Sequence, residues 1–408
     1  WALNNRRDLG GTGTFQQWKN VWGTAGPAGM IQGNGKLLLE PADGSQAMPS
    51  FMMIRSTNGS TTMSGSGHVG ASWAHPEEAM LYGMYYHSWA AFHMRPTQIQ
   101  ADASAIAFAS APPYGIQVGQ FFYAYNVLEE LTAPGECYVD PRLNRLYLYP
   151  PTDKAPGEVL ISMLQTPVLR MRQVKYVTWQ GVIFEASRST AVDVQGCDSV
   201  SFLKCTFRNA GGNGLRLSGS SNLVDGCVLY GLGAGGIRVA GGDRYQLTPS
   251  GTVIQNCDIH HIGRLFSMYE PAINIASLTG ADDCVGITVQ HNEMHHLPHQ
   301  AIWYLGGNNH TIRWNSIHDV VQWSGDASAI YAGRDWGSRG TVIQENLFQA
   351  VGGPIGVRVS GVYFDDSFAG ATVEGNIFIN AGLDTCIQHG GGRDVIIRYN
   401  IFYGAWKG

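Results

Sequence analysis

The sequence predicts an all-β chain in which a right-handed parallel β-helix of about nine coils occupies residues 171–408. One short pattern recurs nine times there: an alternating apolar and polar run leads to Cys, Asn or Gly, and a large apolar residue follows two places on. The repeats lie 22–35 residues apart, which is the spacing of a solenoid whose units bury their apolar faces against one another. Alternation indicates strands, and glycine pairs such as Gly211-Gly212 indicate turns between them.

The residue at the centre of each repeat predicts how the coils stack. We expect Cys205, Cys227 and Cys257 to be reduced thiols on neighbouring coils, because a free cysteine packs as a small hydrophobe. The asparagines are expected to bond along the stack at a turn with left-handed backbone angles, which Asn tolerates. The nine central residues are Gly181, Cys205, Cys227, Cys257, Asn292, Asn315, Asn346, Asn376 and Asn400.

Residues 1–170 contain no such repeat and predict a separate antiparallel β region. The stretches from Leu81 to Phe92 and from Gln120 to Tyr149 have the character of long paired strands, and Ala133-Pro134-Gly135 is a turn signal within the second. A small sandwich-like insertion would account for this pattern. The boundary is expected near Val168 to Val174, after the proline-rich stretch from Pro150 to Pro156.

The composition favours a secreted, extracellular solenoid. Charged residues are 14% of the chain and the net charge is −5, so there is no basic surface for a nucleic-acid partner. No apolar run reaches the ~18 residues of a membrane helix, so no membrane partner is expected. Asn58-Gly59-Ser60 and Asn309-His310-Thr311 would be glycosylation acceptors, as in a glycoprotein, if the protein is secreted by a eukaryote. Low charge and flat stacked surfaces would also suit self-assembly.

The sequence predicts no metal site and no cofactor. The seven cysteines are an odd number and none forms a CxxC pair. The pairs His260-His261 and His295-His296 lack a third ligand at metal spacing along the chain. The Asp365-Asp366 pair, in a glycine-rich turn, could nevertheless bind calcium.

Several long segments carry a family resemblance. They read FFYAYNVLEELTAPGECYVD, AGGIRVAGGDRYQLTP, HHIGRLFSMYEPAI, PHQAIWY, GDASAIYAGRDWGSRGTVI and GVYFDDSFAGATVEGNIF. The chain is similar, over roughly residues 75–408, to secreted right-handed parallel β-helix proteins of the glycoside hydrolase family 141 type, whose characterised members act on fucosylated pectin or xylan. The resemblance implies a polysaccharide-active fold with a β insertion before the main helix. It also implies further coils before the start of this chain. The chain starts at Trp1 without a signal peptide and stops within a coil, so either end could be truncated.

Candidate catalytic residues flank strands that occupy equivalent places on successive coils. These strands begin at Ala272-Ile273, Ala301-Ile302, Ala329-Ile330 and Cys386-Ile387. Glycoside hydrolysis needs two carboxyl groups on opposite sides of a sugar bond, and polar residues that flank equivalent strands should converge. The natural pair is Asp326 with Asp365 or Asp366, which also match acidic motifs of the resembled family. The full candidate catalytic set is Asp326, Asp365, Asp366, Glu270 and His299.

Aromatic and basic residues of the same motifs are the predicted substrate contacts. Tryptophans and tyrosines offer faces on which sugar rings stack, and arginines and histidines offer hydrogen-bond donors. The predicted substrate-binding set is Arg334, Tyr331, Trp336, Trp303, His296 and Arg264.

The predicted function is therefore a glycoside hydrolase acting on an extracellular polysaccharide. One departure keeps an alternative open: Gly325 stands before Asp326 where the resembled family tends to have an acidic doublet. Without a catalytic pair, the β-helix would be a carbohydrate-binding or structural protein of an extracellular filament or wall. A second alternative is a polysaccharide lyase, which needs a basic or tyrosine proton acceptor beside a neutralised uronate; Arg264, Arg334 and the histidines allow it.

Overall fold

The computed structural model describes residues 2–4, 52–65, 73–100, 105–131, 136–149, 160–276, 284–353 and 357–404. The proline-rich stretch from Pro150 to Pro156, which precedes the predicted boundary, lies outside the described residues, as does most of the chain before residue 52. The chain divides into two compact units, Trp1–Ile161 and Ser162–Gly408. No helix in the described part of the chain is long and apolar enough to span a membrane.

The second unit is a parallel β-helix made of three sheets with nine strands each. The first sheet contains β12 (Leu169–Arg172), β15 (Val192–Asp198), β18 (Leu215–Ser220), β21 (Ile237–Ala240), β24 (Ile273–Ile275), β27 (Ile302–Tyr304), β30 (Ala327–Gly333), β33 (Val359–Asp365) and β36 (Ile387–His389). The second contains β13 (Thr178–Gln180), β16 (Ser201–Leu203), β19 (Leu223–Asp225), β22 (Val253–Gln255), β25 (Thr288–Gln290), β28 (Thr311–Arg313), β31 (Thr341–Gln344), β34 (Ala371–Glu374) and β37 (Ile396–Arg398). The third contains β14 (Ile183–Glu185), β17 (Thr206–Arg208), β20 (Val228–Tyr230), β23 (Asp258–His260), β26 (Glu293–His295), β29 (Ser316–Val320), β32 (Leu347–Val351), β35 (Ile377–Ala381) and β38 (Ile401–Tyr403).

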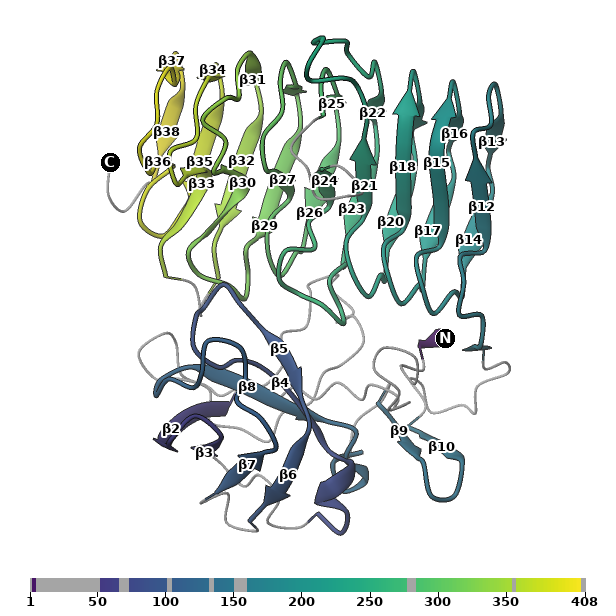
Figure 1. Cartoon of the computed structure of the whole chain (residues 1–408), viewed down its shortest axis with the longest axis vertical. Coiled ribbons are helices and arrows are strands. Elements are labelled where there is room, and N and C mark those ends of the chain that lie inside the picture. The colour runs from purple at the N-terminus through teal and green to yellow at the C-terminus, as the bar shows by residue number, and fades with distance from the viewer. Residues whose placement is uncertain are drawn as a thin grey trace. The chain divides into compact units, whose positions relative to one another are not determined.

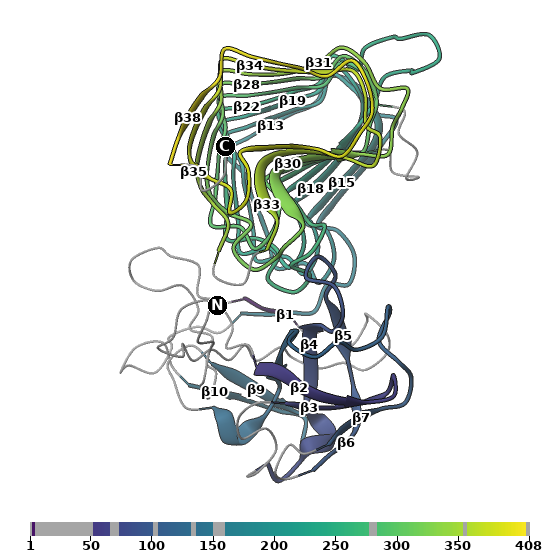
Figure 2. The same ribbon diagram turned by 90° about the vertical axis from the view of Figure 1, so that its left-hand side faces the viewer.

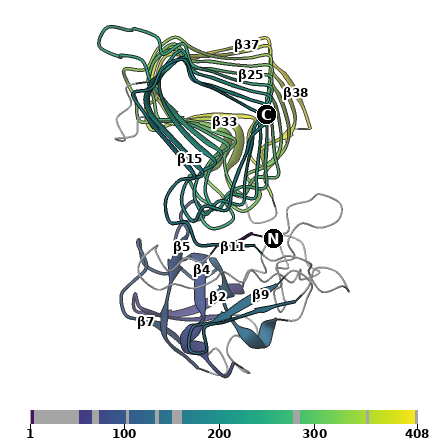
Figure 3. The ribbon, with the colours of Figure 1, turned by 90° about the vertical axis from the view of Figure 1, so that its right-hand side faces the viewer.

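Each coil contributes one strand to each sheet, and every strand pairs in parallel with its equivalent on the next coil. The strands stand side by side along the helix in Figure 1, and the coils superpose when the stack is viewed from either end in Figures 2 and 3. Ile273, Ile302 and Ile330 are register partners on successive coils, as the recurring Ala-Ile strands predicted. Equivalent positions therefore form files that run along the helix axis.

The interior of the helix is apolar and closely stacked. Phe348 and Phe378 on neighbouring coils stack with ring centroids 4.6 Å apart and an interplanar angle of 2°. The predicted cysteine stack is confirmed: all seven cysteines are free, and the backbone N–H of Cys205 donates to Sγ of Cys227 across 3.4 Å. Cys257 continues this file on the next coil, because the residues that follow Cys227 and Cys257, namely Val228 and Asp258, are register partners. Burial of these apolar files holds adjacent coils together.

The asparagines continue this file as a hydrogen-bonded ladder. Nδ2 of Asn292 donates to Oδ1 of Asn315 across 3.0 Å, and the same bond recurs from Asn315 to Asn346, Asn346 to Asn376 and Asn376 to Asn400. Each Oδ1 also accepts the backbone N–H of the preceding asparagine, and each Nδ2 donates to a carbonyl of the preceding coil. The buried amides are thus fully paired, as buried polar groups must be.

Two details of the predicted stack are wrong. The left-handed backbone angles lie one residue before each central residue: His291, Trp314 and Glu345 have φ of 55°, 55° and 53°. Gly181, with φ of 65°, belongs to this left-handed file. Its neighbour Val182 is the true equivalent of Cys205, because Ile183 pairs with Thr206. The turn needs the left-handed conformation at its first position, and the asparagine after it is free to point into the ladder.

The first unit is an antiparallel sheet with strand order β5-β4-β8-β2-β3-β7-β6. Its strands are β2 (Met52–Asn58), β3 (Thr62–Gly65), β4 (Met80–Met84), β5 (Phe92–Met94), β6 (Pro96–Ile99), β7 (Ile106–Phe108) and β8 (Phe121–Tyr125). The remaining elements are the hairpin of β9 (Cys137–Asp140) and β10 (Arg145–Leu148), the 3₁₀ turns η1 (Pro76–Glu78) and η2 (Leu128–Glu130), and the pair β1 (Ala2–Asn4) and β11 (Leu160–Ser162). The two long stretches predicted to pair do meet, because Leu81 pairs with Ala124, but each is divided into shorter strands.

Candidate functional site

The outer face of the first sheet carries one continuous file of polar and aromatic side chains. Their neighbours along each strand, such as Ile302 and Tyr304 beside Trp303, are buried in the core. Alternation in a strand therefore turns the residues between them outward. In register order the file is Arg170, Asp193, Arg216, Arg238, Asn274, Trp303, Tyr331, Tyr363 and Gln388.

Two tyrosines of this file hold Asp365 from both sides. The hydroxyl of Tyr331 donates to Oδ2 of Asp365 and the hydroxyl of Tyr363 donates to Oδ1, each across 2.8 Å. The backbone N–H of Asp366 also donates to Oδ1, across 2.9 Å. Burial and the bonded carboxylate raise the pKa of both phenols above the usual value. Because Asp365 is the acceptor in each of these hydrogen bonds, the arrangement suits a carboxylate anion, which can only accept hydrogen bonds.

The predicted Asp365-Asp366 pair separates in the structure. Asp366 is exposed and forms an ion pair with Arg334, whose Nε lies 2.8 Å from Oδ2. Both side chains are more than half exposed, so this pair contributes little to stability. Asp365 is consequently the member of the doublet that belongs to the tyrosine file, and Asp366 with Arg334 forms its solvent-side edge.

Asp326 lies just before β30, on the coil of Tyr331. It adopts a left-handed conformation with φ of 51° and is half-buried. Its backbone N–H donates to the carbonyl of Val357 across 2.7 Å. After burial and the hydrogen bond that Tyr363 donates to Asp365, the negative charge of Asp326 is the next cause that raises the pKa of Tyr363. The phenol of Tyr363 thus lies within the fields of both Asp326 and Asp365.

Glu270 lies two coils earlier and faces the basic part of the file. Its Oε2 accepts from Nδ2 of Asn213 across 3.2 Å and from the backbone N–H of Gly235 across 3.1 Å. Burial raises the pKa of Glu270 above its usual value, while those hydrogen bonds and the charges of Arg238 and Arg216 oppose the rise. A carboxyl group with a raised pKa is suited to donate a proton.

Tyr269 and His299 connect Glu270 to the aromatic part of the file. The ring of Tyr269 lies 5.1 Å from that of His299 and 5.4 Å from that of Trp303. His299 is buried, with Nδ1 hydrogen-bonded to Oγ of Ser324 at 2.6 Å. Burial lowers the pKa of His299 to about 3. The imidazole is therefore neutral near pH 7 and positions its neighbours rather than exchanging protons with solvent.

The predicted substrate-binding residues fall into two groups. Tyr331 and Trp303 are adjacent in the file, and Arg334 is bonded to Asp366 beside it. Trp336 is exposed, with the guanidinium of Arg393 lying 5.4 Å from its ring centre. The structure does not bring the other two to the file. His296 follows β26 in the third sheet and stacks on His261, and Arg264 adjoins the turn at Gly231.

Sequence reasoning missed several members of this site. Tyr363, Asn274, Arg216 and Arg238 occupy the same outward file as Tyr331, and Tyr269 precedes Glu270. The signal that could have found them is the strand register. Once the Ala-Ile strands are aligned, the residue after each isoleucine faces outward, and the aligned column is polar or aromatic throughout.

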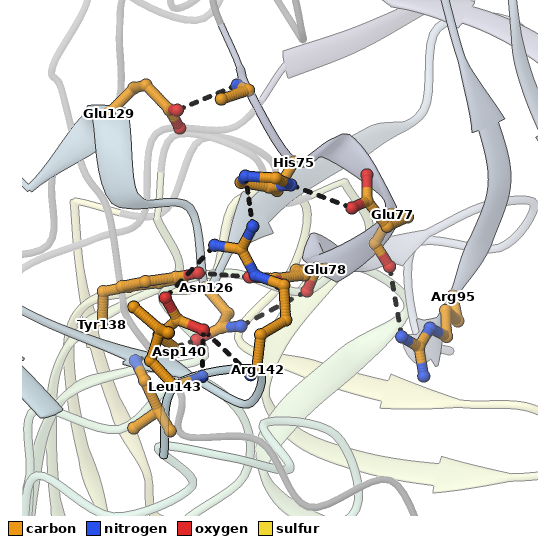
Figure 4. A network of polar contacts seen from close by, with 12 residues as sticks. His75, Glu77, Glu78, Arg95, Asn126, Glu129, Tyr138, Asp140, Arg142 and Leu143 are labelled. Atoms are coloured by element: carbon orange, nitrogen blue, oxygen red, sulfur yellow. Dashed lines mark hydrogen bonds and ion pairs between the residues drawn. The ribbon is translucent and has the colours of Figure 1, made fainter. Parts of the chain in front are cut away.

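A second network of titratable groups lies within the first unit (Figure 4). Glu78 is buried, and its Oε1 lies 2.7 Å from Nε of Arg142. The same guanidinium bonds to Nε2 of His75 and to Asp140, and Tyr138 donates to Glu78. Glu77 accepts from His75 across 3.0 Å. Because Arg142 lies at the centre of these carboxylates, the network is an ion-pair cluster that joins η1 to the hairpin.

Comparison with known proteins defines the family. Residues 169–408 match the family described as the right handed beta helix region. The chain belongs to this right-handed β-helix family. The predicted fold class is thereby confirmed, with the antiparallel sheet of the first unit in addition. No curated protein sequence matches the chain.

Among solved structures, this β-helix protein is similar to one described as a glycoside hydrolase, with a TM-score of 0.56 and 15% identity over 95% of this chain and 82% of that chain. It is also similar to the A-module of mannuronan C-5 epimerase AlgE6 from Azotobacter vinelandii, with a TM-score of 0.41 and 14% identity over 65% of this chain and 71% of the module. A third similar structure is the Gp54 tailspike of Acinetobacter baumannii bacteriophage AP22, with a TM-score of 0.24 and 10% identity over 87% of this chain and 62% of the tailspike. At 15% identity, the likeness to the glycoside hydrolase structure is one of fold alone.

Proposed function

We propose that this β-helix protein hydrolyses a glycosidic bond of an extracellular polysaccharide, with Asp326 and Asp365 as its two carboxyl groups. The observation that supports this proposal most directly is Asp365, whose two carboxylate oxygens accept hydrogen bonds from Tyr331 and Tyr363 at the outer face of the first sheet. The two carboxyl groups come from adjacent coils, one before β30 and one at the end of β33. Two carboxyl groups about one sugar bond are the requirement for this chemistry.

The surroundings of the two groups suggest different roles for them. Asp365 accepts three hydrogen bonds and donates none, so it serves as the fixed anion that faces the anomeric carbon. Asp326 is half-buried and stands on the left-handed residue before β30, from which it would donate the proton to the leaving sugar oxygen. The ring of Trp303, which is partly exposed, would support a sugar ring beside the two carboxyl groups.

Arg216 and Arg238 support an acidic substituent on the substrate. They are register neighbours on adjacent coils of the same outward file, and each is half-buried. Burial and the charge of Arg216 lower the pKa of Arg238 below its usual value. Two like charges at one rung spacing repel each other, and an anionic group bound between them would relieve that repulsion.

The resemblance of the long motifs adds a finer part to the proposal. It supports a glycoside hydrolase of the family 141 type that works outside the cell. The test is a screen of plant and algal polysaccharides for new reducing ends, with the products identified by mass spectrometry. Absence of new reducing ends across neutral and acidic polysaccharides would contradict hydrolysis, and retained binding would then favour a carbohydrate-binding or structural protein.

A lyase is the second candidate, and the Arg216–Arg238 pair is the observation that favours it. A lyase would use these guanidiniums to neutralise a uronate and a tyrosine to accept the proton. The raised pKa of Tyr331 and Tyr363 makes both phenols poorer proton acceptors at neutral pH. Hydrolysis is therefore the better-supported reaction, and unsaturated products that absorb ultraviolet light would reverse that order.

A further inference from the structure

Two loops of the antiparallel sheet in the first unit form one surface. Residues 85–91 follow β4 and residues 109–120 precede β8. Because β4 and β8 are paired antiparallel strands, both loops lie at the same end of the sheet. The backbone N–H of Gln117 donates to the carbonyl of Tyr85 across 2.7 Å. This bond joins the two loops and fixes their positions relative to each other.

Aromatic rings from both loops pack around His87. The ring of His87 stacks on that of Trp89, with centroids 4.6 Å apart and an interplanar angle of 13°. Tyr86 meets the His87 ring edge-on at 4.7 Å, and Tyr114 of the second loop meets it edge-on at 5.0 Å. Tyr114 also lies 5.2 Å from Trp89, at 69°. These four residues, which we call the aromatic cluster, hold one another in defined orientations.

The aromatic cluster is open to solvent. Tyr114 is 58% exposed and Tyr86 is 38% exposed, and the rings of His87 and Trp89 are partly exposed. By contrast Tyr85, which directly precedes Tyr86, is fully buried in the core of the unit. Contiguous exposed apolar side chains on a protein surface mark a site that binds a ligand or a partner.

Tyr114 occupies a turn position that ordinarily requires glycine or asparagine. The backbone N–H of Gly115 donates to the carbonyl of Pro112 across 2.9 Å, and Tyr114, the third residue of this turn, has φ of 68°. With Pro113 as its second residue, the turn is of type II. A tyrosine in the left-handed conformation costs free energy that glycine avoids. The chain thus accepts backbone strain at the position that presents the most exposed ring of the cluster.

The chemistry of the two loops selects the class of ligand. Residues 85–91 and 109–120 include no Lys, Arg, Asp or Glu, so a nucleic acid or an acidic polymer would find no cation there for its charges. A pyranose ring presents C–H groups on its faces and hydroxyls at its edge. Exposed aromatic faces pack against such C–H groups, and the partly or fully exposed side chains of His87, Ser88 and Gln117 can bond to the hydroxyls.

We propose that the aromatic cluster binds uncharged sugar units of a polysaccharide, which makes the first unit a carbohydrate-binding surface. All four residues of the cluster belong to the first unit, whereas the two carboxyl groups proposed for catalysis belong to the second. Binding at the cluster requires no reaction. The cluster can therefore be tested whether or not the β-helix hydrolyses a glycosidic bond.

The test is affinity electrophoresis of the full chain in native gels. The gels contain hydroxyethylcellulose, glucomannan or arabinoxylan, which are soluble and uncharged polysaccharides. The parent chain should be retarded by at least one of them. Tyr114→Gly should weaken that binding about tenfold, because it removes one stacking ring. The same substitution relieves the strain of the turn, so the variant should fold with a Tm near that of the parent chain.

Tyr176→Gly is the matched control. Tyr176 lies in the second unit, has φ of 58° and is 82% exposed, so its replacement makes the same chemical and backbone change at a ring outside the cluster. This variant should be retarded as the parent chain is. Arg238→Gln, which alters the outward file of the β-helix, should likewise leave the retardation unchanged. Tyr86→Ala, which does not alter the turn, should weaken binding as Tyr114→Gly does.

Three results would overturn the proposal. The first is a parent chain that none of the three polysaccharides retards. The second is parental affinity in both Tyr114→Gly and Tyr86→Ala, or in Tyr86→Ala alone if Tyr114→Gly fails to fold. The third comes from analytical ultracentrifugation: a dimer of the parent chain that Tyr114→Gly converts to a monomer would show that the cluster binds a second copy of the chain instead.

Discussion

Tyr363 donates its phenolic hydrogen to Asp365, two residues further along β33, while Tyr331 on the preceding coil donates to the other carboxylate oxygen. Both bonds measure 2.8 Å. This bridge joins two coils through one carboxylate and fixes the direction in which Asp365 faces. It is the rigid element on which the proposed active site depends.

Asp365→Asn should leave the fold intact and reduce turnover by about 100- to 10,000-fold. The amide matches the carboxylate in size but removes the charge and one acceptor for the tyrosine hydroxyls. Initial rates of reducing-end release would measure the effect. Asp394→Asn, which alters an exposed carboxylate paired with Arg393, serves as the control. Near-parental activity of Asp365→Asn would remove Asp365 from the mechanism.

Asp326→Asn should likewise fold and lose turnover by orders of magnitude. Asn tolerates the left-handed conformation of residue 326, so the backbone turn should persist. Circular dichroism and turnover on the same preparation would separate the two effects. A variant that fails to fold would show that Asp326 is a turn cap and would favour the non-catalytic function, whereas full activity would exclude it as the proton donor.

Arg238→Gln should raise the KM for an acidic polysaccharide about tenfold, which corresponds to ~1.4 kcal/mol. The change removes one of two adjacent cations, so the KM for a neutral substrate should hardly alter. Added salt should weaken the parent enzyme on the acidic substrate more than the variant. Arg313→Gln, which lies on the second sheet and bonds to Gln290, is the matched control. Equal effects on both substrates would contradict a role in recognising charge.

Asn346→Ala should lower the free energy of unfolding by about 1–3 kcal/mol. The side chain donates to the carbonyl of Ile312 and to Asn376, and it accepts from Asn315, so its loss leaves buried groups unpaired. Urea titration followed by fluorescence would measure the change. Gln349→Ala, at an exposed position of β32, should cost much less. Similar losses in the two variants would show that the ladder is not a special source of stability.

His299 should make the protein less stable as pH falls below about 6.5. Burial lowers its folded-state pKa to about 3 from a usual value of 6.5, so between these values the unfolded chain binds a proton that the folded chain does not. Stability therefore decreases as pH falls through this window. In His299→Asn the loss between pH 7 and pH 5 should be smaller by about 2 kcal/mol. An unchanged pH dependence, equal to that of His291→Asn, would show that His299 is not buried in the neutral form.

The sequence by itself determined the repeat, the strands and the stacking file. Alternation and the recurrent central residue depend on contacts between neighbouring coils, and each repeat encodes the same contacts again. For this reason the cysteine stack, the asparagine ladder and the aligned Ala-Ile strands could all be predicted. The prediction placed Gly181 at the central position of its repeat, but Gly181 occupies the left-handed turn position just before it. Glycine is compatible with both positions, so the sequence pattern did not distinguish them.

Only the tertiary structure decided which side chains share a surface. The coils differ in length, so residues in one file lie at unequal sequence separations, and no local pattern marks Arg238, Trp303 and Tyr363 as members of the same file. Residues adjacent in sequence can also belong to different surroundings: Asp365 accepts from the tyrosines, whereas Asp366 pairs with Arg334 at the surface. Residues distant in sequence can likewise be neighbours: the 35 residues from His260 to His295 form one coil, so the two rings stack on each other. Strand register and backbone angles, which depend on packing between coils, determine both outcomes.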